Sequence, residues 1–207
     1  MMKRLITVPA ALLLLCALLC STALAAPLMP EEGKTEDGCY RSGDFTFTLP
    51  EGFSQVFFDA ERQTAVFEGK KDVNGFTPEL YLYTADCLLD LDAISAEEEK
   101  AYIQNKLKCT RLMLISEGTE DFDGVTAKVF IFIYNSEDGR IHLYYTLYAN
   151  IGEEASVQFV YNAHCAVRSL TEDLEGVKKA VSTAKIAPVQ AVAEDEASTE
   201  AAESEQE

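Results

Sequence analysis

One apolar segment, residues 125–134, constrains the fold of this chain more than any other. Its odd positions are all apolar, and Phe130, Phe132 and Tyr134 make its last three even positions apolar as well. Successive side chains of a β-strand point to opposite faces of the sheet, so a strand of this kind is covered on both faces. The segment therefore predicts a sheet that lies between two other layers, and it argues against a barrel.

The other strand signals are short segments with alternating apolar side chains. Residues 45–49 alternate cleanly and stop at the turn formers Pro50 and Gly52. Asp123-Gly124 and Asp138-Gly139 separate later segments and tolerate the positive φ angles of tight turns. Connections this short join antiparallel neighbours. The predicted strands are residues 45–49, 56–58, 64–68, 79–84, 112–115, 125–134, 141–148 and 156–161.

Two further segments follow the helical period. Ser95 and Glu98 form a capping box that opens a helix reaching about residue 108, and residues 169–172 repeat the pattern. We therefore predict an α+β fold in which helices pack on both faces of an antiparallel sheet of about six to eight strands, a three-layer α/β/α sandwich. The second helix carries an apolar stripe made of Leu170, Leu174, Val177, Val181 and Ala184.

Residues 1–25 have the form of a secretory signal peptide. Two basic residues precede a 15-residue apolar run, residues 5–19, and Ala23-Leu24-Ala25 offers small residues for cleavage. We therefore expect the mature chain to begin at Ala26, to be secreted, and to have no stable membrane insertion. The alternatives are an uncleaved membrane anchor, for which the run is short, and a lipoprotein attached through Cys16 or Cys20.

Composition divides the rest of the chain into three parts. Residues 26–38 contain two prolines and two glycines and are predicted to be a linker, and residues 39–187 are the globular domain. Residues 188–207 carry seven acidic side chains and no basic or aromatic one, which predicts a disordered acidic tail. With 35 acidic and 17 basic residues, the chain has a net charge of −18, so we expect no nucleic-acid partner.

The order of these elements resembles a known family. TLPEGF (residues 48–53) ends a strand, DFDGV (121–125) enters a long meander of four strands, and STAKI (182–186) ends the terminal helix. This layout resembles the PsbP-like and DcrB-like extracytoplasmic domains. Many relatives have Trp where Phe53 stands, and this chain has no Trp. The resemblance implies an α/β/α sandwich and a non-catalytic accessory or binding role, with no catalytic set to carry over.

Four cysteines follow the signal peptide, an even number that suggests disulfides in a secreted chain. If the predicted strands form one continuous meander, Cys39 and Cys87 lie at one end of the sheet. Cys109 and Cys165 then lie at the other end. Strand parity therefore favours the pairs Cys39–Cys87 and Cys109–Cys165, and four free thiols are the alternative.

The sequence contains no recognisable catalytic or metal-binding set. His142 fits a surface position on a strand, and His164 precedes Cys165 on an extended segment, where neighbouring side chains point apart. The cysteines lack the spacing of a zinc knuckle, and the D-x-D pairs at residues 90–92 and 121–123 lack further calcium ligands. We therefore expect no catalytic residue, no metal and no cofactor.

The abundant tyrosines indicate how such a chain could act. Tyr144 and Tyr148 fall on the more polar face of their strand, and tyrosine is favoured at protein interfaces. The sequence thus favours a secreted, non-catalytic domain that binds an envelope or extracellular protein. Two alternatives stay open: a carrier of a small ligand or cation in a pocket between sheet and helix, and a hydrolase with a carboxylate site.

Overall fold

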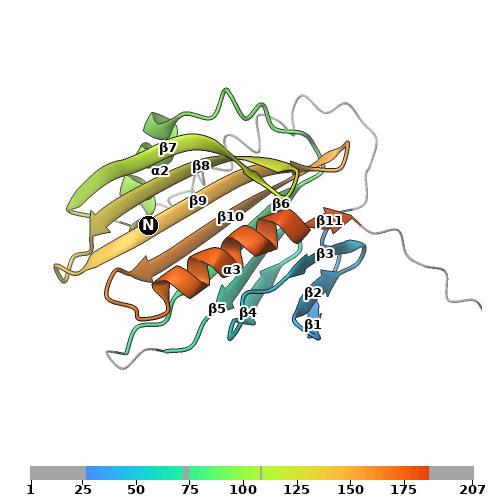
Figure 1. Cartoon of the computed structure of the whole chain (residues 1–207), viewed down its shortest axis with the longest axis horizontal. Helices are drawn as coiled ribbons and strands as arrows, with labels where there is room; N and C mark the ends of the chain where they lie inside the picture. The colour runs from blue at the N-terminus through green and yellow to red at the C-terminus, as the bar shows by residue number, and fades with distance from the viewer. Residues whose placement is uncertain (1–26, 72–74, 108, 187–207) are drawn as a thin grey trace, which may run out of the picture.

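The computed structural model describes residues 27–71, 75–107 and 109–186, which form two antiparallel sheets and two helices, α2 (Ala96–Leu107) and α3 (Leu170–Thr183) (Figure 1). The larger sheet has seven strands, in the order β4 (Ser54–Asp59), β5 (Thr64–Glu68), β6 (Glu79–Ala85), β10 (Ala155–His164), β9 (Ile141–Ile151), β8 (Val125–Asn135) and β7 (Arg111–Phe122). The smaller has four, in the order β1 (Lys34–Glu36), β2 (Cys39–Ser42), β3 (Phe45–Thr48) and β11 (Lys185–Ile186).

Strands β7 to β10 form a meander because tight turns join them. Asp123 and Gly124 turn the chain between β7 and β8 with φ angles of 54° and 90°, and Gly139 has a φ of 81° in the turn between β8 and β9. Glycine enters this left-handed region without steric cost, and aspartate tolerates it. The last strand of the meander then pairs with β6, where Phe159 lies opposite Leu82, so the earlier hairpins extend the same sheet.

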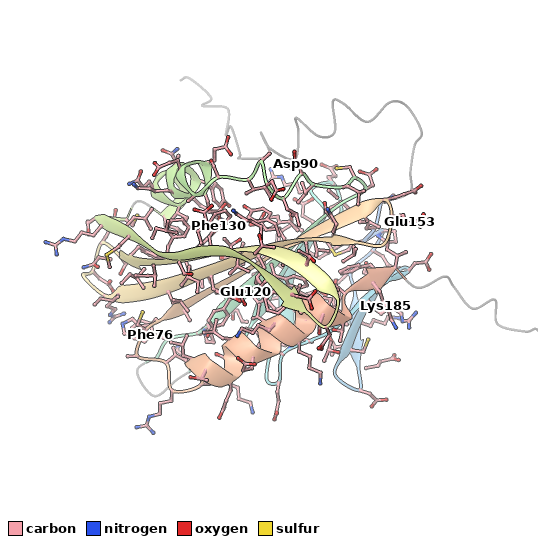
Figure 2. All side chains as sticks on the ribbon, turned by 45° about the horizontal axis from the view of Figure 1, so that its top comes forward. Phe76, Asp90, Glu120, Phe130, Glu153 and Lys185 are labelled. Carbon is pink, nitrogen blue, oxygen red and sulfur yellow. The ribbon has the colours of Figure 1, made fainter. Side chains whose placement is uncertain are left out.

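The two faces of the seven-stranded sheet bury two separate apolar clusters. Val129 of β8 lies in one cluster with Val177 and Val181 of α3. Its neighbour Phe130 lies in the other cluster with Ile103 of α2. Because strand neighbours point to opposite faces, we call these the α3 face and the α2 face, and Figure 2 shows the two helices on either side of the strands. The prediction of a strand that is buried on both faces is confirmed.

The predicted antiparallel sheet is also confirmed, but the fold is not a regular three-layer sandwich around a single sheet. The first predicted strand, β3, pairs with β2 and β11 and not with the large sheet. This smaller sheet shares the α3 face: the ring of Phe47 lies 5.3 Å from that of Phe159, and the Thr48 amide donates to Thr183 Oγ1 at 2.9 Å. Alternation identifies a strand and its two faces, but it does not identify the neighbouring strand.

The segment predicted to be a linker belongs to the fold. Within it, β1 pairs with β2, and the side chain of Met29 is fully buried in the cluster of the α3 face. The side chain of Gln63 holds Met29 in place, because its Oε1 accepts from the Met29 amide at 2.8 Å and its Nε2 donates to the Met29 carbonyl at 2.9 Å. Residues 27–38 are therefore structured, contrary to the linker prediction.

Two predictions concern the ends of the chain. The signal peptide, residues 1–25, and the acidic tail, residues 188–207, lie outside the described residues. In the part of the chain that the structure describes, no helix has the length and apolar character needed to cross a membrane.

Candidate functional site

Two histidines meet at one end of the large sheet. His142 of β9 lies directly opposite His164 of β10, and their ring centroids are 5.4 Å apart. Both are half-buried on the α2 face. The sequence had placed His142 on a surface strand and His164 beside Cys165, without connecting the two. The sequence showed the alternation along each strand, but it did not show the register between β9 and β10 that places the two histidines opposite each other.

Aromatic and cationic side chains stack around this histidine pair. The ring of Phe76 lies 4.2 Å from that of His164 and nearly parallel to it, at 6°. The guanidinium carbon of Arg140 lies 4.4 Å from the Phe76 ring centroid, and Tyr134 stacks on His142 at 5.0 Å. Burial, and next the charge of His164, lower the pKa of His142. The histidine pair and the rings that stack on it therefore form an aromatic platform.

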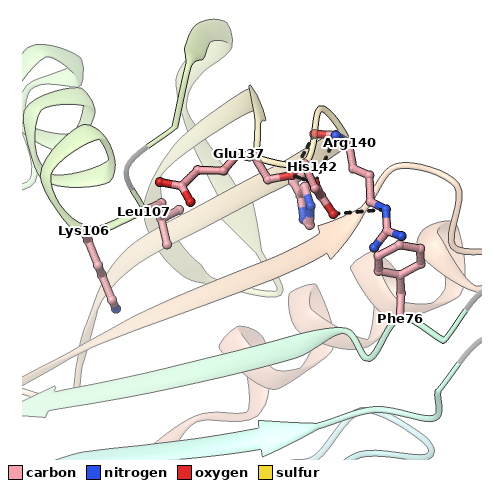
Figure 3. A pocket seen from close by; sticks show the side chains of 8 residues that line it. Phe76, Lys106, Leu107, Glu137, Arg140 and His142 are labelled. Atoms are coloured by element: carbon pink, nitrogen blue, oxygen red, sulfur yellow. Dashed lines mark hydrogen bonds and ion pairs between the residues drawn. The ribbon is translucent and has the colours of Figure 1, made fainter.

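A pocket of about 540 Å³ opens beside this platform. Figure 3 shows Lys106 and Leu107 on one side of it and Arg140 and Phe76 on the other. Arg140 is held by Asp138 at 3.2 Å, so its charge is largely compensated within the pocket wall. The remaining lining residues are Ser136, Glu137 and His142.

The hydrogen bonding of His164 is not that of a metal ligand. The Ala166 amide donates to His164 Nδ1 at 3.1 Å, so the neutral ring carries its proton on Nε2 and has no lone pair there for a metal. No group of three His, Cys, Asp or Glu side chains that could hold a metal ion occurs among the described residues. The next residue, Cys165, is exposed, and burial of its sulfur raises the pKa of its thiol, whereas a nucleophilic cysteine needs a lowered one.

The expected disulfide pairs are not formed in the described part of the chain, where Cys39, Cys109 and Cys165 are free thiols. Cys109 and Cys165 do lie at the same end of the large sheet, as strand parity predicts, but β8 and β9 separate the strands that they flank. The argument for Cys39 assumed one meander, and Cys39 instead belongs to the smaller sheet.

The two tyrosines expected at an interface are covered by α2. Tyr144 is only 3% exposed, and the half-buried Tyr148 donates a 2.5 Å hydrogen bond to Glu99 Oε2 of α2. The same hydroxyl accepts a hydrogen bond from the side chain of Gln158 at 2.8 Å. The polar face of β9 was identified correctly, but the helix that covers it was not, so neither residue is a surface contact.

Glu99 is the group that the sequence analysis missed. It is 5% exposed, and this burial raises the pKa of its carboxyl, while the hydrogen bond from Tyr148 offsets part of the effect. Burial also raises the pKa of Tyr144 and of Tyr148 well above their ordinary value. Glu99 follows the helix start closely, at a position where acidic residues are common, so its sequence context gave no sign of burial.

The two buried acids among the described residues, Glu99 and Asp173, lie on opposite faces of the large sheet and do not form a pair. Asp173 of α3 accepts hydrogen bonds from Tyr161 at 2.7 Å and from Ser169 at 3.0 Å, and it lies on the α3 face, opposite Glu99. The two D-x-D pairs serve turns: Asp90 accepts from the amide of Asp92 at 3.2 Å, and Asp121 accepts from that of Gly124 at 3.0 Å. The first acid of each pair therefore stabilises its own turn.

Exposed apolar side chains lie on both edge strands of the large sheet. On β7, Met113, Leu114 and Ile115 are 55%, 39% and 52% exposed. On β4, Val56 and Phe57 are each 51% exposed. A register shift interrupts the pairing at both places. The sequence predicted a strand of only four residues, 112–115, and therefore missed the long edge that β7 forms.

No known family model and no curated protein significantly matches the chain. Similar solved structures include the Saccharomyces cerevisiae Ran-binding protein Mog1p, with 10% identity, a TM-score of 0.48, and coverage of 75% of this chain and 95% of that one. Another is cyanobacterial PsbP from Synechocystis sp. PCC 6803, with 15% identity, a TM-score of 0.48, and coverage of 73% and 89%. PsbP is also the family that the layout of the sequence resembles.

A third similar structure comes from Bacteroides thetaiotaomicron VPI-5482, with 10% identity, a TM-score of 0.43 and coverage of 69% of this chain. The chain spans only 45% of that protein. Similarities of this size do not indicate what the chain binds or does.

Proposed function

We propose that the chain is a secreted, non-catalytic binding domain that engages another envelope or extracellular protein through strand β7. The observation that carries this proposal is the run of exposed apolar side chains on that strand, Met113, Leu114 and Ile115. Three consecutive residues of this kind are unusual on the surface of a chain with a net charge of −18.

The position of β7 supports the same proposal. It is the last strand of the large sheet, so the outer row of its backbone N–H and C=O groups has no strand beside it in the described part of the chain. Such an edge accepts an extended segment of a partner, which gains main-chain hydrogen bonds and side-chain contacts together. The strand has 12 residues, against six in β4 at the opposite edge. The longer edge is therefore the better partner site.

Site-specific photo-crosslinking in the native cells tests this proposal. A photoreactive phenylalanine analogue in place of Met113 should give one discrete cross-linked species. The same analogue at Phe57 is a matched control, because Phe57 has a similar exposure of 51% on the opposite edge, and it should give none. The substitution Ile115→Lys should abolish the species formed from position 113.

Two results would overturn the proposal. Equal cross-linking from positions 113 and 57 would show that β7 is not preferred. A species from position 113 that survives Ile115→Lys would show that the apolar run does not hold the partner. Circular dichroism of each variant shows whether its fold is retained.

A further inference from the structure

Three tyrosine rings surround the ammonium group of Lys106 near the end of α2. The Nζ atom lies 4.6 Å from the ring centroid of Tyr81, 5.3 Å from that of Tyr102 and 5.9 Å from that of Tyr83. It also donates to the Tyr83 hydroxyl at 3.2 Å. Tyr81 and Tyr83 share one face of β6, while Tyr102 and Lys106 share one face of α2. We call the three rings the tyrosine cage.

A buried carboxyl lies next to the cage. Glu99 precedes Tyr102 by three residues and so lies on the same side of α2. One of its oxygens accepts from Tyr148. The other oxygen, Oε1, and the nearby Tyr144 hydroxyl are buried as well, and Tyr144 favours the ionised form of the carboxyl. The charge of Lys106 favours the ionised form of Glu99, so the carboxyl and the cage attract the same cation.

Lys106 differs from the other lysines that approach rings or helices. Lys128 lies 5.3 Å from the Phe130 ring, but it also forms a 2.9 Å ion pair with Glu117. Lys100 of α2 pairs with Glu97 at 3.8 Å. No ion pair of Lys106 occurs between described residues. Ring faces, and not a contacting carboxylate, hold its ammonium group, which is the geometry by which proteins bind organic cations.

The side chain of Lys106 connects the cage with the surface of the protein. Lys106 itself is exposed and forms part of the wall of the pocket of about 540 Å³ (Figure 3), so its flexible side chain has room to move aside. We propose that the tyrosine cage binds the ammonium group of a small organic cation, and that Lys106 fills the cage in the ligand-free protein. An alkylated ammonium fits best, because the cage presents three ring faces and only one hydroxyl to the cation.

Isothermal titration calorimetry with tetramethylammonium chloride, at constant ionic strength, tests this proposal on the mature chain. Lys106→Ala empties the cage and should bind the probe at least about tenfold more tightly than the parent. Lys128→Ala is the matched control, because it also removes a lysine beside a ring, and it should bind like the parent. Adding Tyr102→Leu to Lys106→Ala should remove the binding.

Equal affinities of the parent and Lys106→Ala, or binding that survives Tyr102→Leu, would overturn the proposal. If Lys106→Ala does not fold, NMR titration of the parent decides. Ring-proton shifts at Tyr81, Tyr83 and Tyr102, with none at Tyr145 on the opposite face, support the site. No shift in these three rings, or equal shifts at Tyr145, counts against it.

Discussion

At the scale of single residues, the buried carboxyl of Glu99 makes the stability of the fold depend on pH. Burial raises the pKa of its carboxyl, so the folded chain binds its proton more tightly than the unfolded chain does. The contribution of Glu99 to stability is then fully present below its unfolded pKa and is lost as the pH rises through its folded pKa. We expect Glu99→Gln to melt at a higher temperature than the parent at pH 8, with a difference that shrinks toward pH 4.

Differential scanning calorimetry across this pH range measures the effect. Glu97→Gln is the control, because Glu97 lies on the same helix but its side chain is 86% exposed, and its melting temperature should follow that of the parent. A gap between Glu99→Gln and the parent that stays constant from pH 4 to pH 8 would contradict the assignment.

Two buried tyrosines on the α3 face offer a second residue-scale comparison. Tyr161 and Tyr145 lie opposite each other on β10 and β9. The Tyr161 hydroxyl donates to Asp173 at 2.7 Å, whereas the Tyr145 hydroxyl is buried and has no partner among the described residues. Tyr161→Phe should therefore cost about 1–2 kcal/mol of unfolding free energy, and Tyr145→Phe should be neutral or stabilising. Urea denaturation measures both, and a larger loss for Tyr145→Phe would contradict this account.

At the scale of elements, α3 follows its sequence pattern closely. Val177 and Val181 are fully buried, and Leu170 and Leu174 pack against the same cluster while partly exposed. Val181→Asp should bury a charge without a partner and cost several kcal/mol, against a total stability of about 5–15 kcal/mol. Leu174→Asp should cost less, because that position is partly exposed. Thermal melting compares them with Lys178→Ser on the exposed side, and a parent-like Val181→Asp would mean that the stripe faces solvent.

The two helix starts show what a capping pattern in the sequence predicts and what it does not predict. Ser95 caps α2 as predicted, because its hydroxyl accepts from the Glu98 amide at 3.3 Å. Ser169 has the same sequence pattern but makes no side-chain cap, and its hydroxyl instead donates to Asp173 at 3.0 Å. A buried carboxylate competes for the hydroxyl at the second site, and the sequence pattern does not contain that information.

At the scale of the whole molecule, the N-terminal segment closes the core. Met29 is fully buried within the predicted linker, so Met29→Ala should leave a cavity and cost about 2–5 kcal/mol. The neighbouring Glu31 is exposed, and Glu31→Ala provides a control that should melt like the parent. Thermal unfolding measures both, and a Met29→Ala variant as stable as the parent would restore the linker interpretation.

The acidic tail is expected to behave in the opposite way. Residues 188–207 contain no apolar periodicity and no aromatic side chain, so their removal should shift the melting temperature by less than about 5 °C. A larger shift would show that the tail docks on the domain. Melting of the truncated and full mature chains, compared at the same ionic strength, decides.

The sequence by itself determined several of the elements and the faces that they present. The alternation of β8, the stripe of α3 and the turn at Asp123-Gly124 depend on backbone geometry over a few residues, and the structure has all three. They could be predicted because the strand period of two and the helical period of 3.6 are local properties of the backbone.

Only the tertiary structure decided which elements meet. In the structure β3 belongs to a second sheet, His142 lies opposite His164, and α2 covers Tyr144. The packing of α2 on the sheet also buries Glu99 and brings three tyrosine rings close to Lys106. The alternation along a strand predicts to which face of the sheet a side chain points. It does not predict which element covers that face, because this depends on the packing of segments far apart in the chain.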